Sequence, residues 1–157
     1  MPMKHVILLI VLCLPAWGCD TYPKDPRNTL KTATGGTLRV GYSENPPWVI
    51  KTDSVPTGIE ANLVKAFAAT LKAQVAWHND TEQNLFEDLE KQKLHLVIAG
   101  ITDNNPWKKK VGLTRPFVET GEKKHVMAAI QGENAFIVRL ERFLHEHEQA
   151  INARVQP

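Results

Sequence analysis

The residues best suited to chemistry lie in a short polar loop that follows an apolar segment. Residues 94–99 are apolar apart from one histidine, and a run of this length predicts a strand buried on both faces of a sheet. The run ends at Gly100, and Ile101 and Thr102 then lead into a polar turn that includes Asn104. The backbone near Gly100 and Ile101, with the side chains of Thr102 and Asn104, can hydrogen-bond a polar group. We therefore predict that this loop contacts a ligand.

Aromatic residues and a lysine near this loop are further candidates. Trp48 follows two prolines, and its indole could either stack on a solute or pack to close the edge of a sheet. Trp107 and Lys108 follow the polar loop, where an indole offers one N–H donor and a lysine offers a cation. The candidate binding residues are Trp48, Gly100, Ile101, Thr102, Asn104, Trp107 and Lys108.

The sequence does not supply the set of groups that catalysis needs. Ser43 and Ser54 are its only serines, and neither lies in a Gly-x-Ser-x-Gly motif. Glu44, Asp53 and Glu60 lie near the expected rim of a pocket, but no base or nucleophile accompanies them at a defined spacing. We therefore expect no enzymatic activity.

The histidines do not predict a metal site. His145 and His147 are two residues apart on a predicted helix, so they face different sides and cannot readily share an ion. His78, His95 and His125 are scattered along the chain, which has no His-Glu-x-x-His motif and no Cys/His ligand set. We expect neither a metal nor a cofactor.

Composition indicates one soluble globular domain. The chain has 157 residues, of which 43% are hydrophobic and 23% charged. Its formal charge of +2, from 19 basic and 17 acidic residues, is too small and too dispersed to predict nucleic-acid binding. The only basic run, Lys108, Lys109 and Lys110, is interpreted as a solvated helix face.

The N-terminus has the pattern of an export signal. Residues 1–18 combine a short basic start, an apolar stretch at 6–14 that is too short to span a bilayer, and a small-residue exit. Cys19 follows directly and resembles the lipidated cysteine of a bacterial lipoprotein, although an ordinary cleaved signal fits as well. Asp20 resembles the signal that retains lipoproteins in the inner membrane.

The elements that must position the polar loop alternate between strand and helix. Residues 19–36, with prolines and a glycine pair, predict a flexible tether, so the folded domain, 37–157, is expected to begin at Thr37. Apolar periodicity then predicts strands at 37–42, 74–78, 94–99 and 124–130, and helices at 59–72, 81–93, 106–110 and 133–152. Asn105 is the expected cap of the third helix. This order indicates an α/β fold with a mostly parallel sheet of about five strands flanked by helices.

Several short motifs, in this order and spacing, resemble the first lobe of the bacterial extracellular solute-binding proteins, family 3. They are Leu38-Arg39-Val40-Gly41, Pro46-Pro47-Trp48, Gly58-Ile59-Glu60, Val97-Ile98-Ala99-Gly100 with Thr102, Pro116-Phe117 and Gly132-Glu133-Asn134. The resemblance implies a lobe of the type II periplasmic-binding-protein fold. It also implies a periplasmic protein that binds small polar solutes such as amino acids for an ABC transporter.

The chain departs from the family in its length. The resemblance implies a complete second lobe after Pro116-Phe117, and two lobes that close on the solute like a clamshell. Here Phe117 and Gly132 are only fifteen residues apart, and no second domain fits in that interval. We therefore predict a single lobe, in which the two crossovers have collapsed into the strand at 124–130.

The binding positions that the resemblance implies are also altered. Trp107 stands where the family has an Arg, or Lys108 does if the alignment shifts by one residue. Asn104 replaces a Thr, while Asn62 and His95 replace acids. A guanidinium fork holds a carboxylate better than a single ammonium does, so we expect a degenerate pocket and weak amino-acid binding by the monomer.

Three hypotheses follow for the function. The first is a membrane-tethered lobe that binds or senses a small polar solute for an inner-membrane transporter or receptor, with a homodimer or that partner as the second wall of the pocket. The second is an interaction module that docks a membrane protein through the face left by the missing lobe, with exposed Trp107 and Phe117 as anchors. The third is a remnant without activity. The expected location is the periplasm, anchored to the inner membrane through Cys19, or otherwise secreted and soluble.

Overall fold

The computed structural model describes residues 22–155. The predicted signal peptide at 1–18 and Cys19 lie outside the described residues. Between residues 22 and 155, every helix is too short or too polar to cross a membrane.

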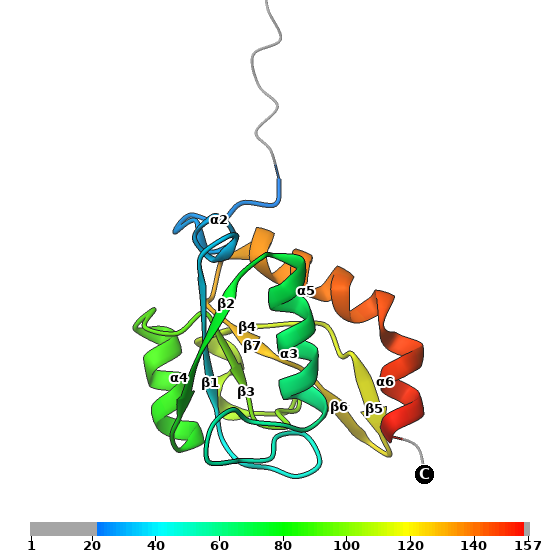
Figure 1. Cartoon of the computed structure of the whole chain (residues 1–157). Coiled ribbons are helices and arrows are strands. Elements are labelled where there is room, and N and C mark those ends of the chain that lie inside the picture. The colour runs from blue at the N-terminus through cyan, green and yellow to red at the C-terminus, as the bar shows by residue number, and fades with distance from the viewer. Residues whose placement is uncertain (1–21, 156–157) are drawn as a thin grey trace, which may run out of the picture.

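A five-stranded sheet forms the centre of the molecule (Figure 1). Its strand order is β2 (Gln74–Asn79), β1 (Thr37–Tyr42), β3 (Leu96–Ile98), β7 (Ala128–Ala129) and β4 (Gly112–Leu113). The first three strands are parallel, and β7 runs antiparallel to both of its neighbours. The predicted α/β class and the mostly parallel sheet of about five strands are confirmed.

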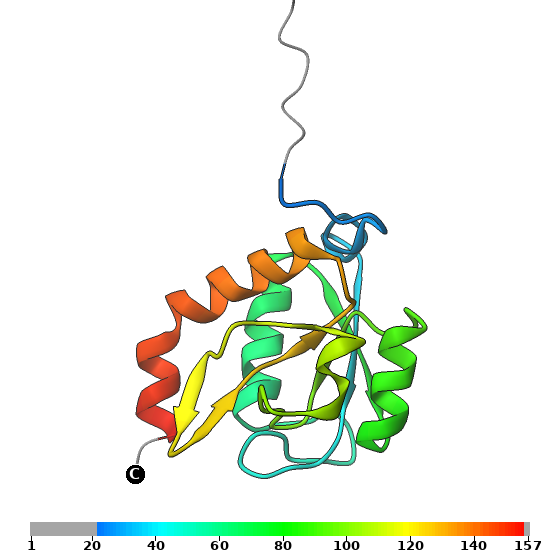
Figure 2. The ribbon, with the colours of Figure 1, turned by 180° about the vertical axis from the view of Figure 1, so that it is seen from behind.

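Helices cover both faces of this sheet. Helices α3 (Ile59–Thr70) and α5 (Asn134–Glu146) lie on one face, and α4 (Glu82–Glu90) and the short 3-10 helix η1 (Pro106–Lys109) lie on the other (Figures 1 and 2). Side chains of a strand alternate between the faces, so Leu96 and Ile98 join the core under α3 while Val97 joins the core under α4. Burial on both faces explains why this stretch of sequence is almost continuously apolar.

Two of the described helices, α4 and η1, begin at a side-chain cap. The Thr81 hydroxyl accepts a hydrogen bond from the Asn84 N–H at the start of α4, over 3.4 Å. The Asn105 side chain accepts from the Trp107 N–H over 3.0 Å, which confirms the predicted cap of η1.

Two predicted elements are each divided in the structure. The predicted helix at 133–152 becomes α5 and α6 (Glu148–Val155), with a break at His147, whose Nδ1 lies 2.8 Å from the Phe143 carbonyl oxygen. The predicted strand at 124–130 becomes β6 (Lys123–His125) and β7, because the chain passes from one sheet to another at residues 126–127.

A tight hairpin occupies the place of a second lobe. Strands β5 (Val118–Thr120) and β6 pair antiparallel, with Thr120 opposite Lys123, so only Gly121 and Glu122 form the turn. Gly121 has φ +61° and Glu122 does not have a positive φ, the pattern of a type II′ turn. The expected single lobe is therefore present, and its crossovers have collapsed into two paired strands instead of one.

The described part of the predicted tether is folded. Helix α2 (Thr29–Ala33) packs against the lobe, with Thr29 and Ala33 buried. The Asp25 carboxylate accepts the Leu30 N–H over 2.8 Å and the Phe136 N–H over 2.9 Å, so one side chain links the starts of α2 and α5. Residues 25–33, which the sequence assigns to the tether before the domain start at Thr37, thus contact the lobe.

Glu133 makes the reciprocal connection. Its side chain is fully buried, and its two carboxylate oxygens accept the N–H groups of Arg27 and Thr29, each over 3.0 Å. Hydrogen bonds to the two carboxylates hold this segment in place, and Leu30 and Ala33 also pack against the core.

The Asp25→Ala variant tests this docking. It removes the acceptor of two backbone N–H groups, so the free energy of unfolding should fall by about 2 to 4 kcal/mol. Urea denaturation followed by circular dichroism measures this change. Lys31→Ala, at an exposed position of α2, is the control and should change stability little. Equal stabilities of the two variants would mean that residues 25–36 are a tether after all.

Candidate functional site

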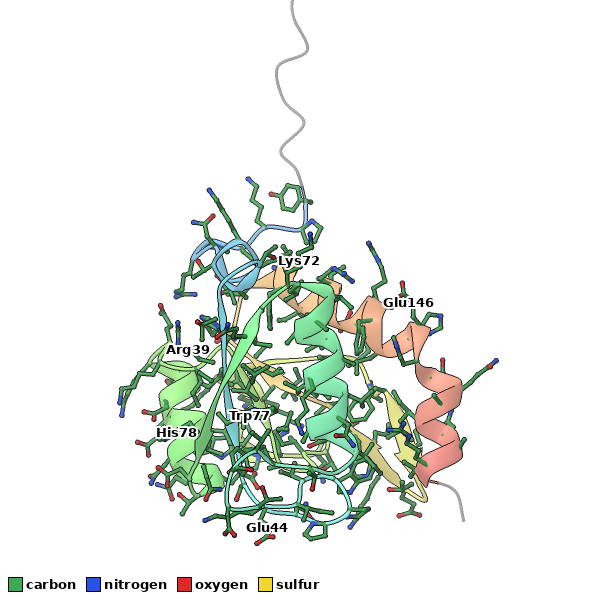
Figure 3. The ribbon with its side chains drawn as sticks, viewed as in Figure 1. Arg39, Glu44, Lys72, Trp77, His78 and Glu146 are labelled. Carbon is green, nitrogen blue, oxygen red and sulfur yellow. The ribbon has the colours of Figure 1, made fainter. Side chains whose placement is uncertain are left out.

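The candidate loop lies at the carboxyl edge of the parallel strands. Because β1, β2 and β3 run in the same direction, their carboxyl ends meet at one edge, which is lowest in Figure 1. Glu44 lies at this edge and Lys72 lies at the opposite one (Figure 3). In open α/β sheets, ligands bind at this edge.

Gly100 turns the chain where β3 ends, in a space that admits no side chain. It has φ +64°, and an added Cβ would lie 2.6 Å from Asn45 Nδ2 and 2.7 Å from Trp48 Cδ1. Asn45 Nδ2 also donates to the Ala99 carbonyl over 2.8 Å. The glycine is therefore required both by its backbone conformation and by its close neighbours.

Glu60 holds the same turn from inside the protein. Its Oε2 accepts the Gly100 N–H over 2.9 Å, and its Oε1 has no hydrogen-bond partner within residues 22–155. The side chain is 0% exposed, and this burial raises the pKa of Glu60 to about 8, against the opposing effect of the backbone of Gly100 and Ala99. Glu60 therefore lies beneath the loop. The expectation that it lies near the rim of a pocket is wrong.

Trp48 is a packing residue. It is 7% exposed, its ring stacks on the His125 ring at a centroid distance of 3.9 Å, and the Phe117 ring lies edge-on to it at 6.4 Å. Of the two interpretations of Trp48, these contacts favour packing, because the His125 and Phe117 rings both lie against its indole. The expectation that Phe117 is exposed is wrong, because that side chain is also 7% exposed.

Strand β6 fixes the far side of the loop. Thr102 pairs with His125 in an isolated antiparallel bridge. Two backbone hydrogen bonds of 2.9 Å flank this bridge: the Val126 N–H donates to the Ile101 carbonyl, and the Asp103 N–H donates to the Lys124 carbonyl. Ile101 itself is buried. The hairpin thus contributes directly to the shape of the candidate loop.

His125 joins this hairpin to the interior. Its Nε2 lies 2.7 Å from the Thr120 hydroxyl, and its Nδ1 is buried without a partner in the described part of the chain. Burial lowers the pKa of His125, so the neutral imidazole is favoured in its stack against Trp48.

Thr102 and Asn104 remain available to a ligand. The Thr102 carbonyl accepts the Asn105 side chain over 2.7 Å, but its backbone N–H makes no hydrogen bond within residues 22–155. Thr102 is half-buried and Asn104 is exposed. The loop therefore presents one unused backbone donor from a segment that is held on both sides.

Trp107 and Lys108 have different surroundings. The Trp107 ring lies parallel to Phe86 of α4 at 5.3 Å, and Lys110 Nζ lies 5.4 Å from its centroid. The expectation that Trp107 is exposed is therefore wrong, since the half-buried indole packs on α4. Lys108 is exposed, and its ammonium makes no hydrogen bond or ion pair with another residue in the range 22–155.

The two positions at which the resemblance implies lost acids lie elsewhere. His95 is buried at the start of β3, where its Nδ1 accepts the Arg39 N–H over 3.3 Å; burial lowers the pKa of His95 to about 4, so it is neutral. Asn62 lines a small cavity of about 150 Å³ with residues of α6. The sequence did not reveal the roles of Glu60 and His125, because both depend on contacts across the fold.

These features define a class of protein: a single open α/β lobe with a rigid polar loop at the carboxyl edge of its parallel strands. The sequence pattern of the bacterial extracellular solute-binding proteins, family 3, matches residues 38–154, so this chain belongs to that family. No curated protein sequence matches it.

Solved structures show the same fold. The arginine-bound form of domain 1 of TmArgBP, the T. maritima arginine-binding protein, has 22% identity and a TM-score of 0.67, over 74% of this chain and 97% of that one. A substituted form of that domain gives 21% and 0.69, over 77% and 98%. An ancestral cationic amino-acid solute-binding protein gives 13% and 0.71, over 83% and 100%.

The pH dependence of stability tests the buried state of Glu60. The folded protein keeps this proton up to about pH 8, whereas the unfolded chain releases it near 4.5. Stability is therefore lost as the pH rises through this window, by at most about 1.4 kcal/mol per pH unit. Glu60→Gln stays neutral, so it should gain on the wild type between about pH 5 and about pH 9, as measured by urea denaturation.

Glu122→Gln, at an exposed position of the hairpin turn, is the control for Glu60→Gln and should follow the wild type at each pH. A stability difference between Glu60→Gln and the wild type that stays constant with pH would contradict the assignment.

Proposed function

We propose that this protein is a single-lobe solute-binding protein that takes a small polar solute, such as an amino acid, at the loop of residues 100–105. The observation that carries the proposal is the unused N–H of Thr102, in a loop fixed by Glu60 on one side and by β6 on the other. A donor that is held in place before binding loses little conformational freedom when it meets an anion.

The chemistry of the loop suits a carboxylate. The Thr102 N–H and hydroxyl and the Asn104 amide can donate hydrogen bonds, and Lys108 supplies a positive charge. The ammonium of Lys108 is a point charge without the two-pronged geometry of a guanidinium, and Trp107 is committed to α4. The proposed pocket is therefore degenerate, with weak affinity for a free amino acid.

A single lobe offers one wall to the solute. The arginine-bound structure of domain 1 of TmArgBP supports the idea that one lobe of this fold can hold an amino acid. Pockets that hold small ligands tightly bury most of the ligand surface, so tight binding here requires a second wall. A homodimer or an inner-membrane transporter or receptor would supply it.

The proposed location is the periplasmic face of the inner membrane, with Cys19 as the lipidated anchor. The export pattern of residues 1–18 and the family to which the chain belongs support this location. Mass spectrometry of the protein extracted from bacterial membranes tests it, because an acylated Cys19 at the N-terminus has a distinct mass and an unmodified N-terminus contradicts the anchor.

The alternative of a protein-docking module has lost its main support. It rested on Trp107 and Phe117 as exposed anchors, and both rings are packed against other aromatic rings of the lobe. We therefore retain solute binding as the proposal.

Amide NMR tests the role of Thr102 directly. Addition of L-arginine or L-glutamine should shift the Thr102 amide resonance, with a dissociation constant on the order of 1 mM for the monomer. Lys108→Gln should weaken binding several-fold, because it removes the charge. Lys124→Gln, on the exposed side of the hairpin, is the control, because it removes one positive charge from the protein without removing Lys108. A silent Thr102 amide up to about 20 mM of either amino acid would refute the proposal.

A further inference from the structure

A second cavity lies apart from the carboxyl-edge loop. It has a volume of about 440 Å³ and lies between α5, the start of α6 and the segment that precedes β5. These elements occupy the side of the lobe away from α4 (Figures 1 and 2). The volume is within the range of small-molecule sites, and of the candidate residues of the loop none lines it.

The floor of this cavity is apolar and fixed. Phe117, Leu144 and Val138 line it; Phe117 and Leu144 are buried, and the Phe117 ring is held edge-on against Trp48. An adjoining cavity of about 260 Å³ shares Pro116, Phe117 and Glu148 with the first and continues toward β5, where Val118, Glu119 and Asn152 also line it. The two cavities together have room for a solute with an apolar side chain.

One acid of the rim is already neutralised. The Glu141 carboxylate accepts the Arg115 N–H over 2.7 Å, and Arg115 Nε lies 3.5 Å from its other oxygen. The Glu141 side chain is only 16% exposed, which leaves it little room for a further partner. Arg115 and Glu141 therefore close one side of the cavity as a pair.

Two other charged groups of the rim retain bonding capacity. Arg142 makes no hydrogen bond and no ion pair with any residue in the range 22–155, and it is exposed. Glu148 Oε2 lies 3.1 Å from His145 Nδ1, while Glu148 Oε1 has no such contact with the described residues. The cavity thus presents a free guanidinium fork and a free carboxylate oxygen above an apolar floor.

We propose that this cavity binds a zwitterion with an apolar side chain, an amino acid or a short peptide. Its carboxylate would pair with the Arg142 fork, its ammonium would pair with Glu148, and its side chain would cover Phe117. A guanidinium suits a carboxylate because it makes two parallel hydrogen bonds, and the carboxylate of Glu148 is a matched acceptor for an ammonium. This site is independent of the loop at residues 100–105.

Three ligands that each carry a phenyl ring separate the contributions of the ligand's two charges to binding. L-phenylalanine carries both charges, phenylacetate only the negative one and phenethylamine only the positive one. Amide NMR with each, up to about 20 mM, should show shifts around Phe117 and Arg142 that are saturable for phenylalanine and at least about tenfold weaker for the other two. Equal affinities for phenylalanine and phenylacetate would overturn the zwitterion assignment, and so would the absence of shifts with all three.

Variants that remove single charges locate the site. Arg142→Gln and Glu148→Gln should each weaken phenylalanine binding by about tenfold or more. Arg139→Gln, one helical turn earlier on α5, is the matched control, and Lys108→Gln tests the proposed loop site; neither should affect binding here. If Lys108→Gln abolishes phenylalanine binding while Arg142→Gln does not, the ligand belongs to the loop and the second site is refuted. Loss of binding in the Arg142 and Glu148 variants alone supports this cavity whatever the outcome at Thr102.

Discussion

The hydrogen bond from the Gly100 N–H to Glu60 is the contact on which the candidate site depends. Strand β3 is buried on both faces, and where the chain leaves it, the Gly100 N–H points inward and needs an acceptor. A fully buried acid at the start of α3 satisfies it. The cost of burying that acid appears as its raised pKa, and the benefit is a turn whose geometry is fixed before any ligand arrives. Asn45 and Trp48 fill the remaining space around Gly100.

The β5–β6 hairpin supports the same loop from the other side. It contributes the His125 ring to the stack with Trp48, and its backbone bonds to residues 101 and 103. Phe117 touches the other edge of Trp48 and is also the floor of the second cavity. The aromatic cluster of Trp48, His125 and Phe117 thus lies between the two proposed sites.

Helices and strands were predicted well where the burial of one face produces a periodic pattern of apolar residues in the sequence. Strand β1 was predicted residue for residue at Thr37–Tyr42, because its apolar residues alternate. The Asn105 cap was predicted because its chemistry is local. The roles of Trp107 and Phe117 could not be predicted, since their burial depends on Phe86 and Trp48, which are distant in sequence.

The N-terminal segment was missed for a related reason. Hydrogen bonds between carboxylates and backbone N–H groups help to hold residues 25–36, and three of them, from Arg27 and Thr29 to Glu133 and from Phe136 to Asp25, join residues more than a hundred positions apart. Such bonds leave no periodic pattern in the sequence. The same holds for Glu60, which the sequence placed at a pocket rim because its motif gives no sign of the depth at which the side chain lies.

The two-residue turn at Gly121 and Glu122 is a position at which the chain could accept an inserted domain. Thr120 and Lys123 are directly paired, so the chain leaves the lobe and returns to it at neighbouring positions. Paired residues of an antiparallel ladder have Cα atoms about 5 Å apart. A whole domain whose own ends are equally close could replace the turn without disturbing the pairing of β5 with β6, because insertions are best tolerated at exposed loop tips. The turn at Gly121 and Glu122 is therefore a point at which this lobe could take up a further domain while β5 and β6 stay paired.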